Sequence, residues 1–130
     1  MKTIALLGRI LFSLIFLTSG FNHFSSESIN YASAQGVPIP SLLVPASGIL
    51  AVLGALSIIL GYKARLGAWM IVLFLIPVTL MMHNFWNITD PAMKQMQMAM
   101  FMKNISMLGA ALLITYFGPG PLSIDNKSTI

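Results

Sequence analysis

The chain has 130 residues and a net charge of +4, with 57% of its residues hydrophobic and only 8% charged. Because a water-soluble domain carries about 25% charged residues, this composition excludes a soluble globular protein. The basic residues are too scattered to form a nucleic-acid-binding surface, and a chain without cysteine forms neither disulfides nor thiolate metal sites.

Four apolar segments, near residues 4–21, 42–60, 66–82 and 99–117, are long enough to cross a membrane as helices. The hydrocarbon core is about 30 Å thick and needs about 20 helical residues. Lipid cannot satisfy exposed backbone groups, so helix is the only structure open to such segments. We therefore predict one all-α domain, an up-down bundle of four membrane-spanning helices. Residues 118–130 begin with two Gly-Pro pairs, and we expect them to form a loose tail.

The first apolar segment begins with a basic residue, as a cleaved signal peptide does. However, Arg9 interrupts the apolar run, and no convincing cleavage site follows it. We therefore interpret the segment as the first membrane span. Arg9 is then a structural polar residue. It either extends to the nearby membrane surface or joins an internal hydrogen-bond network with backbone carbonyls or Tyr62.

Small residues at helical spacing predict where the spans pack closely, because they let two helix backbones approach each other in lipid. They occur in the second span as Ser47, Gly48, Ala51, Gly54 and Ala55, and in the fourth span as Ser106, Gly109 and Ala110.

The charged residues predict the orientation in the membrane. One side of the predicted bundle carries Lys2, Lys63, Arg65 and Lys127, whereas the loops on the opposite side carry Glu27, Asp90 and a single lysine, Lys94. Loops rich in lysine and arginine stay in the cytoplasm. We therefore expect both termini to be cytoplasmic.

Polar residues gather at the outer ends of three predicted spans, and they are His23, His83, Asn84, Lys103 and Asn104. Polar groups at this depth are costly and mark candidate sites. We predict that these five residues form a cluster at the outer mouth of the bundle. Their donors suit carbonyl or anionic oxygens, so a quinone headgroup or a small oxyanion would fit.

His83 also has simpler interpretations. Histidine and tryptophan near a membrane surface often anchor a helix, and Trp86 has the position of an aromatic-belt residue. Two histidines at one level, His23 and His83, could also ligate a haem in a bundle core. No sequence motif for covalent haem attachment accompanies them, and we predict no metal site.

Six methionines lie between residues 93 and 107. Thioethers suit Cu(I), but Met96, Met98, Met100 and Met102 alternate by two, which scatters them around a helix axis. Apolar filling at the bundle surface is the simpler interpretation, and the pattern leaves copper binding open.

Five pieces of the chain together resemble the DoxX family of small four-span membrane proteins. They are GRILFSLIFLTSGFNHF, AQGVPIPSLL, GILAVLGALSIILGYKARLGA, MMHNFW and MKNISMLGAALLI, in this order. The resemblance implies a multi-pass protein of the bacterial inner (plasma) membrane. Some members of that family are membrane subunits of thiosulfate:quinone oxidoreductases, which implies quinone and a redox partner protein. Many members of that family carry lysine where this chain has His23, and an acidic residue in the second span. This chain has Ala51 and Val52 there, and the missing carboxylate argues against proton-coupled chemistry.

The sequence therefore leaves two alternative functions open. One is a membrane subunit of a redox system that binds quinone or another small ligand at the outer cluster. The other is a non-enzymatic binding, transport or scaffold protein. In the first case a catalytic residue would have to come from another subunit, since the chain shows no redox centre of its own.

Overall fold

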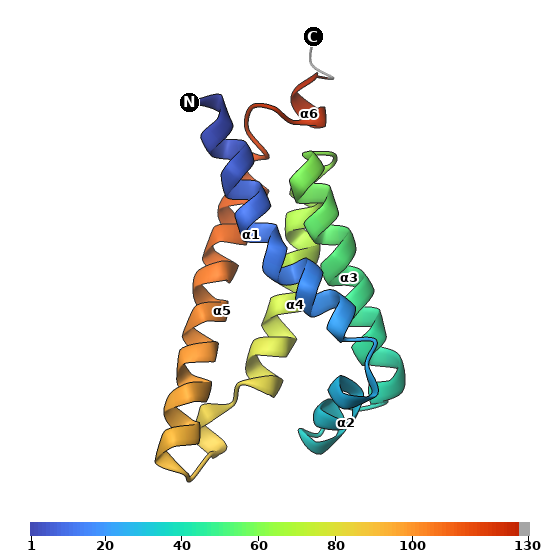
Figure 1. Ribbon diagram of the computed structural model, residues 1–130, viewed down its shortest axis with the longest axis vertical. Coiled ribbons are helices and arrows are strands. Elements are labelled where there is room, and N and C mark those ends of the chain that lie inside the picture. Colours follow the sequence, from blue (N-terminus) through green and yellow to red (C-terminus); the bar gives the residue numbers. More distant parts are fainter. Residues whose placement is uncertain (128–130) are drawn as a thin grey trace.

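The computed structural model describes residues 1–127, and every regular element within them is a helix. Consecutive long helices run in opposite directions, as Figure 1 shows. The elements are α1 (Lys2–Asn22), α2 (Ser26–Ala34), α3 (Pro40–Leu60), α4 (Ala64–Met82), the 3-10 helix η1 (Phe85–Asn87), α5 (Pro91–Phe117) and α6 (Ile124–Lys127).

Four segments are long and apolar enough to cross a membrane, and they are Lys2–Asn22, Pro40–Leu60, Ala64–Asn87 and Pro91–Phe117. The predicted all-α fold with four spanning helices is therefore confirmed. The predicted span near residues 99–117 lies inside a longer helix, because α5 already begins at Pro91. The Asp90 carboxylate accepts a hydrogen bond from the Met93 N–H at 3.0 Å, and this cap extends the helix into a polar stretch.

The loop between the first two spans contains a helix that was not predicted. The Ser25 hydroxyl accepts a hydrogen bond from the Ser28 N–H at 3.2 Å and caps α2, and Glu27 favours the same end of the helix dipole. Helix α2 packs against α3, at the end of the bundle where α1 ends. Its sequence lacks a long apolar stripe, which is why periodicity did not reveal it.

Helices α1 and α3 make backbone contact at two glycines. A Cβ atom on Gly20 would lie 2.6 Å from Val52 Cγ2 and 2.9 Å from the Gly48 carbonyl oxygen. A Cβ atom on Gly48 would lie 2.9 Å from His23 Cβ. No larger residue fits at this crossing, and the crossing also fixes the end of α1 that carries His23.

Helices α3 and α4 are packed in the same way, through Gly54 and Gly67. A Cβ on Gly54 would lie 2.9 Å from the Gly67 carbonyl oxygen. Ala51 and Ala55 beside them are fully buried. The small residues predicted to form the packing surface of the second span therefore do so.

Helix α5 is packed differently. The helices α1 and α3, α3 and α4, and α4 and α5 pack against one another, but within residues 1–127 α1 and α5 share no comparable interface. The only buried residues of α5 are Asn104 and Ala111. The small-residue surface predicted around Gly109 is wrong, because a Cβ there would meet nothing within 4 Å.

The segment after α5 is not a loose tail as far as residue 127. The Asp125 carboxylate accepts hydrogen bonds from the Lys63 N–H at 2.8 Å and the Ala64 N–H at 3.0 Å, so it caps α4 from a distance in sequence. The Asp125 N–H donates in turn to the Gly61 carbonyl at 2.8 Å. The expectation of a loose tail is therefore wrong up to residue 127. The residue before α4 provides no side-chain cap, and the tail provides one instead. Residues 128–130 lie outside the described residues.

The N-terminal end of α1 and helix α6 lie at the same end of the bundle in Figure 1, whereas α2 and η1 lie at the other. The two ends therefore carry the charges that the sequence analysis assigned to opposite sides. The direction in which the bundle crosses the membrane stays a prediction.

We predict that Gly20→Ala destabilises the protein, because the added methyl group meets Val52 and the backbone of Gly48. Overpacking of this kind costs about 1–3 kcal/mol. The matched control is Gly8→Ala in the same helix, where a Cβ meets nothing within 4 Å and helix propensity adds about 1 kcal/mol. Thermal unfolding in detergent, followed by circular dichroism, measures both. A Gly20→Ala variant that melts at or above the Gly8→Ala variant would contradict the crossing.

We predict that Asp125→Ala releases the tail and exposes the start of α4, because both N–H groups at that end lose their acceptor. Loss of a capping group costs about 1 kcal/mol. Hydrogen–deuterium exchange should show faster exchange at residues 118–127 and at Lys63 and Ala64. The control is Asp90→Ala, which removes a cap at the opposite end of the bundle. Equal protection of the tail in both variants would refute the clamp.

Candidate functional site

A cavity of about 150 Å³ lies between α1, α4 and α5. Three of the predicted site residues line it, namely His83 at the end of α4 and Lys103 and Asn104 on α5, and Ser19 of α1 joins them. The rest of its wall is apolar. A cavity of about 150 Å³ in another protein is large enough for benzene, so this one has the size of a single ring or a compact headgroup.

Asn104 is the most informative residue of this cavity. Its side chain is only 5% exposed, and within residues 1–127 it forms no hydrogen bond, although it lines the cavity. Its amide offers two donors and an acceptor and stays open to the cavity, since it is not among the enclosed polar atoms of the bundle. The position therefore favours a bound molecule that hydrogen-bonds the amide.

Lys103 brings a positive charge to the rim of the cavity. Its side chain is exposed, and its ammonium group lies 3.5 Å from the Met100 sulfur, which is a weak acceptor. No carboxylate among the described residues pairs with it. Lys103 can therefore attract an anionic or strongly polar oxygen toward Asn104.

His83 is held by a residue that the sequence analysis missed. Its Nδ1 lies 2.8 Å from Oε1 of Gln97 on α5. An amide oxygen only accepts hydrogen bonds, so Nδ1 is the donor in this pair. Gln97 precedes Asn104 by seven residues, a spacing that places both on one side of α5. That spacing is the signal by which Gln97 could have been found.

His23 is near the cluster but lines a neighbouring cavity of about 350 Å³, which it shares with His83 and Ser19. Its Nδ1 lies 2.8 Å from the Ser47 hydroxyl, which donates to the Val44 carbonyl at 2.6 Å and so accepts from the ring. Burial lowers the pKa of His23 below its usual range, and hydrogen bonding to the Val44 backbone opposes this. The structure thus places His23 beside the Asn104 cavity as a neutral, packed ring.

Asn84 lines neither cavity. It stands at the start of η1, where its carbonyl accepts a hydrogen bond from the Asn87 N–H at 3.1 Å. The following Trp86 is half exposed and packs edge-on against Phe85 and Phe101. The aromatic group therefore fixes the turn after His83, and Asn84 belongs to that turn.

Arg9 is buried, with an exposed fraction of 4%, so it does not extend to the membrane surface. Its Nη2 donates to the Leu122 carbonyl at 2.6 Å and, more weakly, to the Pro121 carbonyl at 3.4 Å. Of the two predictions for Arg9, the hydrogen-bond network with backbone carbonyls is the one the structure shows. Its partners are carbonyls of the tail, not Tyr62.

The methionine-rich stretch lies on the surface of α5. Met93, Met96, Met98 and Met102 are each between 41% and 57% exposed. Within residues 1–127 no group of three or more His, Asp or Glu side chains comes together as a metal site would require. The exposed thioethers provide an apolar surface where the helix faces lipid.

Comparison with known proteins places the chain among small membrane proteins. It is 31% identical to the inner membrane protein YphA of Escherichia coli over 94% of this chain and 88% of that protein. It is 28% identical to the inner membrane protein YqjF of the same organism over 92% and 88%. The ER-derived vesicles protein ERV29 of Saccharomyces cerevisiae is 29% identical over 63% of this chain and 26% of that protein. No solved structure gives a significant match.

These relatives confirm the predicted location, and the chain is a multi-pass inner-membrane protein embedded in the lipid bilayer. The resemblance to the DoxX family was wrong, because the family model that matches residues 2–130 is a different one. The quoted segments are mostly apolar, so they identify a four-span bundle better than a family. The chain belongs to the SURF4 family.

Proposed function

We propose that this inner-membrane protein binds the polar headgroup of a small amphiphile in the cavity between α1, α4 and α5. The observation that carries the proposal is Asn104, a buried amide that lines the cavity and has no hydrogen-bond partner within residues 1–127. Lys103 and Ser19 add a cation and a hydroxyl at the same place.

The chemistry of the lining selects the headgroup. Asn104 and Lys103 donate hydrogen bonds, so the ligand carries accepting oxygens such as a carbonyl or a carboxylate. The wall contributed by Phe16, Phe74 and other apolar side chains suits a ring or the start of an acyl chain. A quinone and a fatty acid both meet these conditions.

The route to the cavity follows from the packing. Helix α5 packs against α4, and within the described residues it has no comparable interface with α1. The cavity touches all three helices, so it lies along this weakly packed seam. An amphiphile dissolved in the membrane reaches such a seam without crossing the bundle.

Ligand binding alone is the function that the geometry supports. A role as a membrane subunit of a redox system was inferred from the DoxX resemblance, and the family match removes that inference. Quinone stays one form of the proposed ligand because its carbonyl groups suit the donors of the cavity.

We further propose that both termini are cytoplasmic and that the cavity lies toward the outer face. The end of the bundle that holds the start of α1 carries Lys2, Lys63 and Arg65, and positive residues of short loops stay in the cytoplasm.

We predict that Asn104→Leu weakens binding of both a short-chain ubiquinone analogue and decanoate by at least about tenfold, which corresponds to about 1.4 kcal/mol. The substitution keeps a similar volume and removes every hydrogen bond of the amide. Isothermal titration calorimetry on the detergent-solubilised protein measures the effect. His83→Ala removes only contacts of the cavity lining and should weaken both probes less than Asn104→Leu does, and Lys103→Gln should weaken decanoate more than the quinone analogue.

The matched control for this experiment is Lys94→Gln, a lysine of α5 that lies outside the cavity lining. It should bind both probes as the parent protein does. Mass spectrometry of co-purified lipids from the parent and the Asn104→Leu variant tests the same site without an added probe. If neither probe binds, or if Asn104→Leu and Lys94→Gln behave alike, the proposed site is wrong.

We predict that a membrane-impermeant maleimide labels Ser26→Cys but not Thr3→Cys in intact spheroplasts, and labels both after permeabilisation. The chain contains no cysteine, so each variant has one reactive thiol. Both positions are exposed, and they lie at opposite ends of the bundle. The reverse labelling pattern would invert the proposed orientation.

A further inference from the structure

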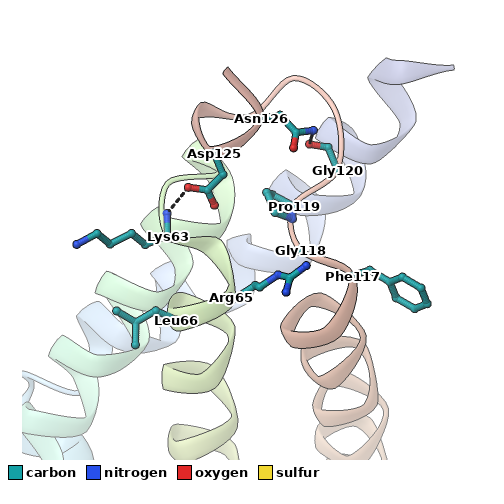
Figure 2. Close-up of a pocket in the computed structure, with 9 residues that line it drawn as sticks. All are labelled: Lys63, Arg65, Leu66, Phe117, Gly118, Pro119, Gly120, Asp125 and Asn126. Carbon is teal, nitrogen blue, oxygen red and sulfur yellow. Dashed lines mark hydrogen bonds between the residues drawn. The ribbon is translucent and has the colours of Figure 1, made fainter. Parts of the chain in front are cut away.

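Another cavity lies at the opposite end of the bundle from the proposed ligand site. It has a volume of about 470 Å³ and is formed by the start of α4, the end of α5 and the tail. Figure 2 shows the residues that line it, among them Lys63, Arg65, Leu66, Phe117, Gly118 and Asp125.

Arg65 is the central cation of this cavity. Its side chain extends toward Gly118 in Figure 2, and Nε lies 3.2 Å from the place that a Cβ on Gly118 would occupy. A Cβ there would crowd the guanidinium, and the φ of +79° at Gly118 also favours glycine. Within residues 1–127 Arg65 forms no hydrogen bond or ion pair, and its side chain is exposed. Its planar fork of donors is therefore available to an oxyanion.

The lining carries two cations, Arg65 and Lys63, and one carboxylate, Asp125, so its net charge is positive. Asp125 uses its carboxylate oxygens to accept the N–H groups of Lys63 and Ala64, so it holds the backbone in place. The Lys63 ammonium lies 5.6 Å from the centre of the Tyr62 ring, and its side chain points away from Arg65 in Figure 2. Arg65 is thus the primary cation, and Lys63 is a second cation at the edge.

The position in the membrane indicates what kind of oxyanion fits. Arg65 is in the first turn of a spanning helix, which lies at the level of lipid headgroups. Leu66 and Phe117 beside it are 58% and 70% exposed, so apolar surface for an acyl chain adjoins the cation. Basic pockets between spanning helices on the cytoplasmic side bind anionic headgroups.

We propose that this cavity binds the phosphate group of an anionic phospholipid, with Arg65 as the main contact and Lys63 in support. The site is independent of the Asn104 cavity and of any ligand bound there. A free phosphate would offer the same oxygens, but the exposed apolar side chains beside Arg65 favour the lipid as the source.

The two tryptophans of the chain make the proposal measurable. Trp69 is half exposed and follows Arg65 by one helical turn, about 6 Å deeper along the axis, so a lipid chain bound at Arg65 passes near it. In a Trp86→Phe background Trp69 is the single reporter. The protein is reconstituted into bilayers of phosphatidylcholine and phosphatidylglycerol in which only one lipid carries bromine on its chains, because bromine quenches tryptophan fluorescence.

We predict that brominated phosphatidylglycerol quenches Trp69 more than brominated phosphatidylcholine at the same mole fraction. One cation at the membrane surface enriches anionic lipid by about fivefold. Arg65→Gln should reduce the quenching by the two lipids to nearly equal values, Lys63→Gln should have a smaller effect, and Arg65→Lys should keep part of the preference. The control is Lys94→Gln, which lies at the opposite end of the bundle and should leave the preference unchanged.

Equal quenching by the two lipids in the parent protein would overturn the proposal, as would a preference that Arg65→Gln leaves intact. Thermal unfolding of the Arg65→Gln protein checks that it is folded. If that variant unfolds, a reduced preference in both Lys63→Gln and Arg65→Lys supports the site, and an unchanged preference in both overturns it. Displacement of the lipid by millimolar inorganic phosphate at constant ionic strength would assign the cavity to free phosphate instead.

Discussion

The contact between the backbones of α1 and α3 at Gly20 and Gly48 is the constraint on which the rest of the bundle depends. It leaves no room for a side chain between the two helices. Gly54 and Gly67 bring α3 and α4 together in the same way, so three helices form one tight unit. Because apolar side chains gain little by leaving lipid for a bundle, such close packing supplies much of the cohesion. Helix α5 lacks an equivalent glycine contact, and the space that remains along its seam with α1 is the candidate ligand cavity.

The same crossing also organises the polar end of the bundle. Gly48 lies against His23, and this brings the ring into hydrogen-bonding distance of Ser47, one residue before Gly48. His23 is then committed to α3, whereas His83 is committed to α5 through Gln97. In each histidine, Nδ1 forms a hydrogen bond with a side chain of a neighbouring helix. Both rings therefore act first as links between helices, and a ligand can use only the remaining ring nitrogen.

The sequence predicted which segments span the membrane, but it predicted only some of the faces by which these helices pack together. Spanning helices could be predicted because lipid leaves a long apolar segment no other structure. The packing surface of α3 could also be predicted, but spacing alone could not show that α5 turns Asn104 and Ala111 inward and leaves Gly109 outside. His83, Lys103 and Asn104 were grouped by depth, which brings them to one cavity, whereas depth did not separate Asn84, which belongs to the turn. The contact of Arg9 with Leu122 joins residues 113 apart, and no local pattern reports such a contact.

The buried polar atoms of the bundle fall into two kinds, and the difference bears on function. The Nε and Nη1 atoms of Arg9 and the hydroxyl of Ser13 lack partners, but they are enclosed, so no molecule can reach them. Docking of the tail on Nη2 offsets part of that cost, which makes Arg9 a structural residue. The Asn104 amide is different because it borders open space at the seam between α1 and α5. The described residues offer it no hydrogen-bond partner, so this amide is the one of the two kinds that a molecule in the cavity can reach.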